Sequence, residues 1–167
     1  VFAAALEENG IAGGDRVMIY LPNSVQWIVA WLGIQGAGCV GVPITPIYTP
    51  HDLNYIANDS GASAIVCADT NFGYVQQVLP DTGLKQVIVA QMTDLLPWWK
   101  RWFGYLYDVV PKGKIATGAN ILRFKQLLKQ YRGRRPSDID SDGHKTAEIL
   151  YTGGTTKFPK GVPLSHD

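Results

Sequence analysis

The sequence of 167 residues holds only two cysteines and three histidines. Cys39 and Cys67 lie in apolar stretches without the spacing of metal ligands, so we expect buried free thiols in a reducing compartment. His51, His144 and His166 are scattered along the chain and form no ligand cluster. We therefore expect no metal site built from histidine and cysteine.

Long apolar runs are also missing, and none approaches the roughly twenty residues that a membrane-spanning helix needs. No basic segment followed by an apolar stretch resembles a secretory leader, so we expect a cytoplasmic protein. Hydrophobic residues make up 46% and charged residues 17%, a composition typical of a globular domain. The chain starts at Val1, without a methionine and inside a helical pattern, so we expect a piece of a longer protein.

The net charge of +1 conceals an uneven distribution. Ten of the fifteen lysines and arginines lie between Lys100 and Arg135, and Asp108 is the one acidic residue in that stretch. Such asymmetry indicates an anionic partner for one region of the chain.

Short β-rich runs alternate with helical patterns along the sequence. Strands are predicted over 15–21, 39–44, 62–69, 84–91 and 147–152, and helices over 1–9, 23–38, 49–61 and 71–80. Asn23 or Ser24 can cap the second helix, and Pro50 and Gly61 suit the ends of the third. The second helix has apolar residues near helical spacing at Val25, Ile28, Val29, Leu32 and Ile34. This alternation predicts an α/β fold, a mostly parallel sheet with helices on both faces.

The last predicted strand runs into "YTGGTTKFPKGV", residues 151–162. Open α/β sheets place ligand sites at the carboxyl ends of strands, where this loop lies. A phosphate needs close backbone approach, hydroxyl groups and positive charge, and the loop supplies them from Thr152, Gly153, Gly154, Thr155, Thr156, Lys157, Lys160 and Gly161. It is not a Walker A loop, because the spacing of glycines and lysine differs. A flexible hairpin connection is the structural alternative.

The same loop resembles the phosphate-binding signature of the adenylate-forming enzymes, Tyr/Phe-Thr-Ser-Gly-Thr/Ser-Thr-Gly-x-Pro-Lys-Gly-Val, and meets ten of its twelve positions. Residues 14–66 are similar to the amino-terminal region of acyl-CoA synthetases, especially the bacterial and archaeal long-chain fatty acid type. "PLSHD", residues 163–167, resembles the continuation of the signature.

This resemblance implies an ATP-dependent reaction in two steps. A fatty acid carboxylate attacks the α-phosphate of ATP to give acyl-AMP and pyrophosphate, and the thiol of coenzyme A then displaces AMP. The resemblance assigns phosphate contact to Thr152, Gly154, Thr155, Thr156 and Lys160, and places His166 near the acyl-adenylate pocket. A structural histidine is the alternative for His166. Gly153 replaces the usual serine, and Lys157 replaces the usual glycine, where it either adds a phosphate contact or weakens the loop.

The resemblance also implies what the chain does not contain. Residues 1–167 correspond to part of an amino-terminal AMP-binding domain, the first lobe of the enzyme fold. The adenine-binding segment, the glutamate that binds Mg²⁺ and the carboxy-terminal domain would follow residue 167. We therefore expect this chain alone to be inactive.

Residues 92–135 depart from the sheet pattern and form a predicted basic, aromatic insert. Apolar residues follow helical spacing at Leu95, Trp99, Trp102, Phe103, Leu106 and Val110. Such a helix docks on the domain, or it lies at the inner face of the cytoplasmic membrane through Trp99, Trp102 and Phe103, with Lys100 and Arg101 attracting anionic lipid. No nucleic-acid module is present, so we expect no nucleic-acid partner.

The sequence is therefore consistent with three functions. The first is a ligase that joins a long-chain fatty acid to coenzyme A. The second is an adenylation domain or acyl-AMP ligase that delivers to a carrier protein. The third is a non-catalytic remnant, which the unusual Lys157 makes conceivable.

Overall fold

The structure, a computed structural model, describes residues 1–97, 113–138, 142–152 and 158–167. Within these residues the strands are β1 (Arg16–Tyr20), β2 (Val40–Pro43), β3 (Ala64–Ala68), β4 (Gln86–Ala90), β5 (Ile121–Arg123), β6 (Thr146–Thr152) and β7 (Lys160–Ser165). They form one sheet in the order β5-β4-β3-β1-β2-β6-β7. All neighbouring strands are parallel except β6 and β7, which are antiparallel. The predicted mostly parallel α/β sheet is confirmed.

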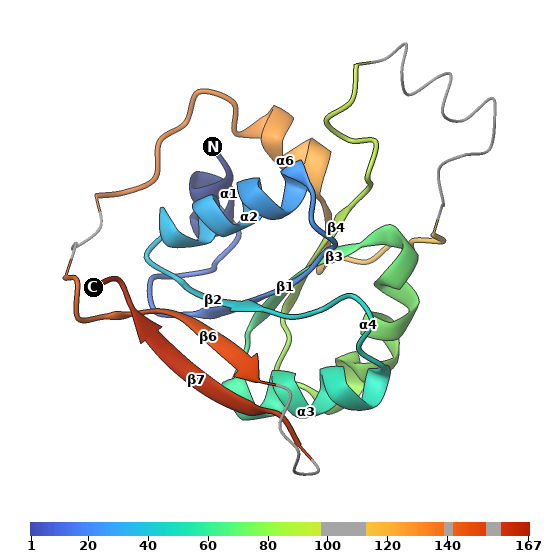
Figure 1. Ribbon diagram of the computed structural model, residues 1–167. Coiled ribbons are helices and arrows are strands. Elements are labelled where there is room, and N and C mark those ends of the chain that lie inside the picture. The colour runs from blue at the N-terminus through green and yellow to red at the C-terminus, as the bar shows by residue number, and fades with distance from the viewer. Residues whose placement is uncertain (98–112, 139–141, 153–157) are drawn as a thin grey trace.

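Helices cover both faces of the sheet (Figure 1). The described helices are α1 (Phe2–Glu8), α2 (Val25–Gln35), α3 (Pro50–Ser60), α4 (Phe72–Val78) and α6 (Phe124–Gln130). Short 3₁₀ turns, Asp69–Asn71 and Leu79–Asp81, flank α4. One apolar core joins α1, α2 and α6 to the sheet, and a second joins α3 and α4 to its other face. Strands β1 to β4 are buried on both sides, which explains their nearly continuous apolar sequences.

The ends of α2 and α3 follow from their local sequence. The Trp27 backbone N–H donates to Ser24 Oγ at 3.2 Å, so Ser24 is the cap that the sequence predicted as one of two. The N–H and the hydroxyl of Thr49 both donate to Asp52 Oδ2, at 2.9 and 2.7 Å. Gly61 ends α3 with a φ of 64°, a left-handed conformation that glycine adopts without strain.

Helix α2 has the predicted spacing, and Ile34 is buried and Val29 half-buried against the core, but three of the five predicted apolar residues do not face it. Val25, Ile28 and Leu32 are 60%, 53% and 57% exposed. The buried residues of α2 are Gln26, Ala30, Gly33 and Ile34. Phe2 of α1 packs directly on Gly33, where an added Cβ would lie 2.5 Å from the Phe2 ring. Close approach of the two helices thus decides which side of α2 is buried.

Part of the predicted insert belongs to the sheet. Strand β5 pairs with β4, with Val87 opposite Ile121, and α6 follows it immediately. Phe124 is fully buried and its ring centre lies 5.0 Å from that of Phe2. The carboxyl end of residues 92–135 thus lies in the sheet and in a helix that packs on it, and the exposed basic residues there, such as Lys125, belong to an ordinary amphipathic helix.

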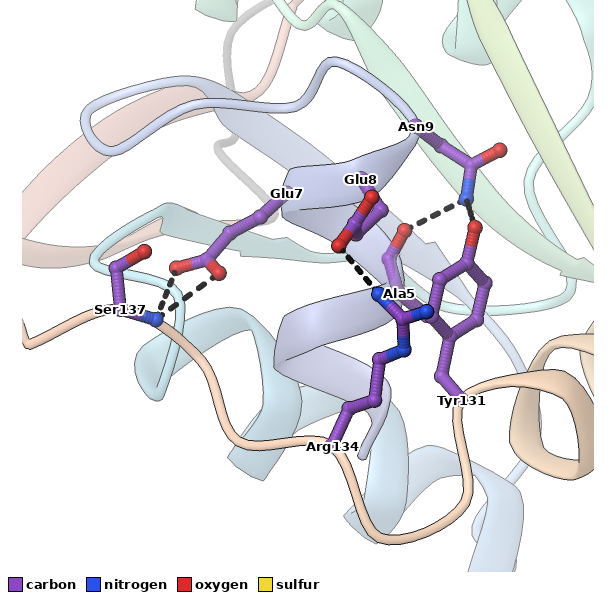
Figure 2. Close-up of polar contacts among 7 residues, drawn as sticks. All are labelled: Ala5, Glu7, Glu8, Asn9, Tyr131, Arg134 and Ser137. Atoms are coloured by element: carbon purple, nitrogen blue, oxygen red, sulfur yellow. Dashed lines mark hydrogen bonds and ion pairs between the residues drawn. The ribbon is translucent and has the colours of Figure 1, made fainter.

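The connection after α6 runs along α1 (Figure 2). Arg134 forms an ion pair with Glu8 at 2.9 Å, and the Ser137 N–H donates to both carboxylate oxygens of Glu7 at 3.2 and 3.1 Å. One cation of the basic stretch is therefore neutralised within the chain itself.

The two cysteines are free and buried, as predicted. Burial raises the pKa of the Cys39 thiol to about 12, and burial also raises that of Cys67. Both thiols stay protonated near neutral pH and are poor nucleophiles.

Candidate functional site

The described residues of the stretch 151–162, which are 151–152 and 158–162, lie at one end of a β-hairpin. In the β6–β7 pair, Thr152 is opposite Lys160 and Tyr151 is opposite Gly161. Because β6 runs parallel to β2, this end of the hairpin is at the carboxyl edge of the parallel strands (Figure 1). Thr152 Oγ1 donates to the Lys160 carbonyl oxygen at 3.5 Å, so the two residues lie side by side where the connecting loop begins and ends.

Gly161 has a packing role in this hairpin. A Cβ at this position would lie 3.0 Å from Ile149 Cγ2 and 3.1 Å from Tyr151 Cζ. The bare backbone therefore lets the Tyr151 ring lie across β7. Any larger residue at position 161 would have to displace that ring.

Tyr151 joins the hairpin to α3. Its hydroxyl donates to Asp59 Oδ2 at 2.6 Å. Burial, together with the hydrogen bond to the Asp59 carboxylate, raises the pKa of Tyr151 well above its ordinary value. The hydroxyl is therefore a stable donor at neutral pH.

Phe158 makes the second contact between the hairpin and α3. Its ring centre lies 4.8 Å from that of Tyr55, with planes 24° apart, and 6.1 Å from the His51 ring. A cavity of about 330 Å³ lies between Phe158 and this side of α3. Nothing in the local sequence signals these contacts, because α3 and the hairpin are about ninety residues apart.

Lys160 is the cation that the structure describes in the candidate loop. Its side chain is exposed, and none of the ion pairs among the described residues involves it. A lysine that has no ion-pair partner among the described residues, in a strand position opposite a threonine, can hold an anion such as a phosphate.

The structure does not bring His166 to the hairpin end that carries Thr152 and Lys160. His166 follows β7, and its N–H donates to the Gly143 carbonyl oxygen just before β6. The hairpin is six residues long on the β7 side, so its two ends are about 20 Å apart. His166 instead lines a cavity of about 730 Å³ together with the turn at Gly13 and Gly14.

Several predicted residues lie outside the described ranges. These are Gly153, Gly154, Thr155, Thr156 and Lys157 of the loop and Trp99, Lys100, Arg101, Trp102 and Phe103 of the basic segment. Within the part of the chain that the structure describes, no group of three His, Cys, Asp or Glu side chains could hold a metal ion. No helix in that part is long and apolar enough to cross a membrane.

Comparison with known proteins gives a family match along the entire chain. The model of the family described as AMP-binding enzyme matches residues 1–167. A long-chain-fatty-acid–CoA ligase of Bacillus subtilis is 35% identical over 98% of this chain, and one of Escherichia coli O157:H7 is 37% identical over 99%. The chain spans about 30% of the length of each relative.

Solved structures share the fold. A long-chain-fatty-acid–CoA ligase from Archaeoglobus fulgidus superposes with a TM-score of 0.73 at 25% identity, covering 99% of this chain and 28% of that one. The apo structure of Mycobacterium smegmatis MbtA gives a TM-score of 0.76 at 28% identity, covering 99% of this chain and 27% of that one.

Proposed function

Since the chain belongs to the AMP-binding enzyme family, we propose that it supplies the ATP phosphate-binding loop of an enzyme that activates a long-chain fatty acid to acyl-AMP and then to acyl-CoA. The observation that carries the proposal is the hairpin end, where Thr152 lies opposite Lys160 at the carboxyl edge of the sheet and where no ion pair among the described residues involves Lys160. The relatives named long-chain-fatty-acid–CoA ligases support the substrate class.

In the proposed reaction a carboxylate oxygen bonds to the α-phosphorus of ATP, and the bond from that phosphorus to the bridging oxygen of pyrophosphate breaks. The sulfur of coenzyme A then bonds to the acyl carbon, AMP leaves, and the thiol gives up its proton. Such transfers depend on positioning and on neutralisation of the phosphate charge. Lys160 contributes that charge and Thr152 a hydroxyl donor, together with the loop residues Gly153, Gly154, Thr155, Thr156, Lys157 and Gly161.

The remaining parts of the active site are assigned to the rest of the protein. We propose that the adenine pocket, the acyl pocket, the Mg²⁺ ligands and a carboxy-terminal domain lie outside these residues, so that the isolated chain is inactive.

The test is carboxylate-dependent exchange of pyrophosphate into ATP by the full-length protein, with acids from acetate to oleate. We expect exchange with long-chain acids and no exchange with short-chain acids such as acetate. Lys160→Ala should lower the exchange rate by about 10- to 100-fold, the loss expected for one charge-assisted hydrogen bond. The matched control is Lys125→Ala, which removes an equally exposed lysine from α6.

The outcomes separate the three functions. No exchange in a folded protein means a remnant that has lost the chemistry. Exchange followed by acyl transfer to a carrier protein, and not to coenzyme A, means an adenylation domain. Formation of acyl-CoA means the proposed ligase.

We also propose that the protein is cytoplasmic and contacts the inner face of the membrane through Trp99, Lys100, Arg101, Trp102 and Phe103. Aromatic and basic side chains together suit an anionic lipid surface. The full-length protein should float with liposomes that contain anionic lipid. Unchanged flotation after Trp99, Trp102 and Phe103 are replaced by alanine would contradict this contact.

A further inference from the structure

One side of α3 faces the hairpin. His51, Tyr55 and Asp59 are spaced four residues apart, so they lie in a row along the helix. Phe158 contacts the rings of His51 and Tyr55, and Tyr151 donates to Asp59. The two hairpin residues flank the candidate loop, one on each side.

From this arrangement we infer that α3 positions the phosphate-binding hairpin, and that Asp59 and Tyr55 are positioning residues for ATP. They act through Tyr151 and Phe158 on the placement of Thr152 and Lys160. The inference rests on the proposed function, because it assigns these contacts a role in ATP binding. We call the four residues Tyr55, Asp59, Tyr151 and Phe158 the α3–hairpin contact.

The sheet alone holds this end of the hairpin weakly. Strand β6 pairs with β2 at Gly41 and Glu148, three residues before Tyr151. Every residue of β7 is exposed. Among the described residues, the side-chain hydrogen bonds and ring contacts that join the hairpin end to the domain are those with α3. Ile149 and Tyr151 also pack against the core on this side of the sheet, so the contacts with α3 add to that packing in fixing the hairpin end.

Helix α3 is well suited to act as a rigid support. Leu53, Ile56 and Ala57 are fully buried against the sheet. The Thr49–Asp52 hydrogen bonds fix its first turn, and Gly61 fixes its end. A hairpin end held against such a helix keeps its donors in place before ATP arrives, which lowers the entropic cost of binding.

The test uses Tyr151→Phe and Asp59→Ala in the full-length protein. Each should raise the KM for ATP in pyrophosphate exchange by about three- to tenfold, the value of one net hydrogen bond. The KM for the fatty acid should stay unchanged, because the acyl pocket does not use this contact. The double variant should be no worse than the poorer single variant, because both remove the same hydrogen bond. Asp59→Asn keeps an acceptor and should restore most of the affinity.

The matched control is Tyr74→Phe, which removes an exposed hydroxyl from α4. It should leave both KM values unchanged. Trypsin cleavage at Lys160 supplies a readout that needs no activity: Tyr151→Phe and Asp59→Ala should speed it several-fold, and Tyr74→Phe should not.

The outcomes are distinct. A raised KM for ATP with faster cleavage supports the inference. Faster cleavage with an unchanged KM for ATP in an active enzyme shows a merely structural contact and overturns it, as does no change in either measurement. If the unmodified protein shows no exchange, the proposed function fails. The trypsin cleavage rates then test whether α3 holds the hairpin. Equal cleavage rates in the unmodified protein and in all variants would show that it does not.

Discussion

At the residue scale, the fit between Gly33 and Phe2 fixes how α1 and α2 pack. Phe2 is buried, and its ring occupies the space that any side chain at position 33 would need. A glycine inside a helix ordinarily costs about 1 kcal/mol relative to alanine. Its presence here is explained by the close approach of the two helices.

We predict that Gly33→Ala destabilises the protein by about 1–3 kcal/mol, because the overpacked ring has to shift. Gly73→Ala is the matched control. That glycine also lies in a helix, α4, but nothing lies within 4 Å of its added Cβ, so it should be neutral or slightly stabilising. Thermal unfolding of both variants measures the difference, and equal losses would contradict the packing explanation.

A second residue-scale prediction concerns pH. Hydrogen bonds from Thr49 to the Asp52 carboxylate hold the pKa of that group below its usual value. The ionised Asp52 carboxylate therefore adds to the free energy of unfolding at pH values above about 3.8, the pKa of the group in the unfolded chain. This contribution is lost as the pH falls through the lower pKa of the folded protein. Asp52→Ala should lower the free energy of unfolding by about 1 kcal/mol at pH 7. It should not lower it at a pH below the folded pKa of Asp52, where the carboxylate of the unmodified protein is already protonated. Asp138→Ala, at an exposed aspartate, is the matched control and should leave the free energy of unfolding nearly unchanged at pH 7.

At the element scale, β5 and α6 extend the sheet beyond β4. Their sequence is strongly basic, but one face is apolar and enters the core through Phe124 and Leu127. The basic residues of α6 therefore lie on its solvent side, and its apolar face determines where the helix packs.

Phe124→Ala should destabilise the protein by about 3–5 kcal/mol, the usual cost of removing a buried aromatic ring. Its neighbour Lys125 is exposed, and Lys125→Ala should change stability by less than about 0.5 kcal/mol. Denaturant unfolding of the pair compares the two faces of one helix. A small loss for Phe124→Ala would mean that β5 and α6 are not part of the core.

The elements also show how far sequence reasoning reaches. The strands β1 to β4 and the helices between them were predictable, because their apolar runs are long and separated by glycine or proline. Strand β5 has three residues, and its pairing with β4 gives no local signal. Strand β7 contains Pro163 and is wholly exposed, so it lacks the alternation of a typical strand. The loop motif was visible in the sequence, but the contact of Tyr151 with Asp59 arises from tertiary packing alone.

At the scale of the whole molecule, the connection from α6 to β6 crosses from the side of the edge strand β5 to the far side of the sheet, where β6 lies next to the edge strand β7. Contacts with Glu7 and Glu8 hold part of it against α1 (Figure 2). These groups are exposed, so the contacts should contribute little to overall stability.

We predict that Glu7→Ala leaves the melting temperature nearly unchanged but speeds trypsin cleavage after Arg132 and Arg134, because the Ser137 N–H loses its acceptor. Glu7→Gln retains an acceptor and should stay close to the unmodified protein. Equal cleavage of all three proteins would show that the connection is held by other contacts.

The strand order has a consequence for synthesis. Residues 16–90 contain β1 to β4, and these four strands are neighbours in the middle of the sheet. A chain that leaves the ribosome amino end first can therefore assemble the centre of the sheet before β5 and β6 are made. Later residues are added to edges that already exist. The hairpin that carries the candidate ATP donors is the last of these described additions. It can therefore pack against α3 after that helix has folded.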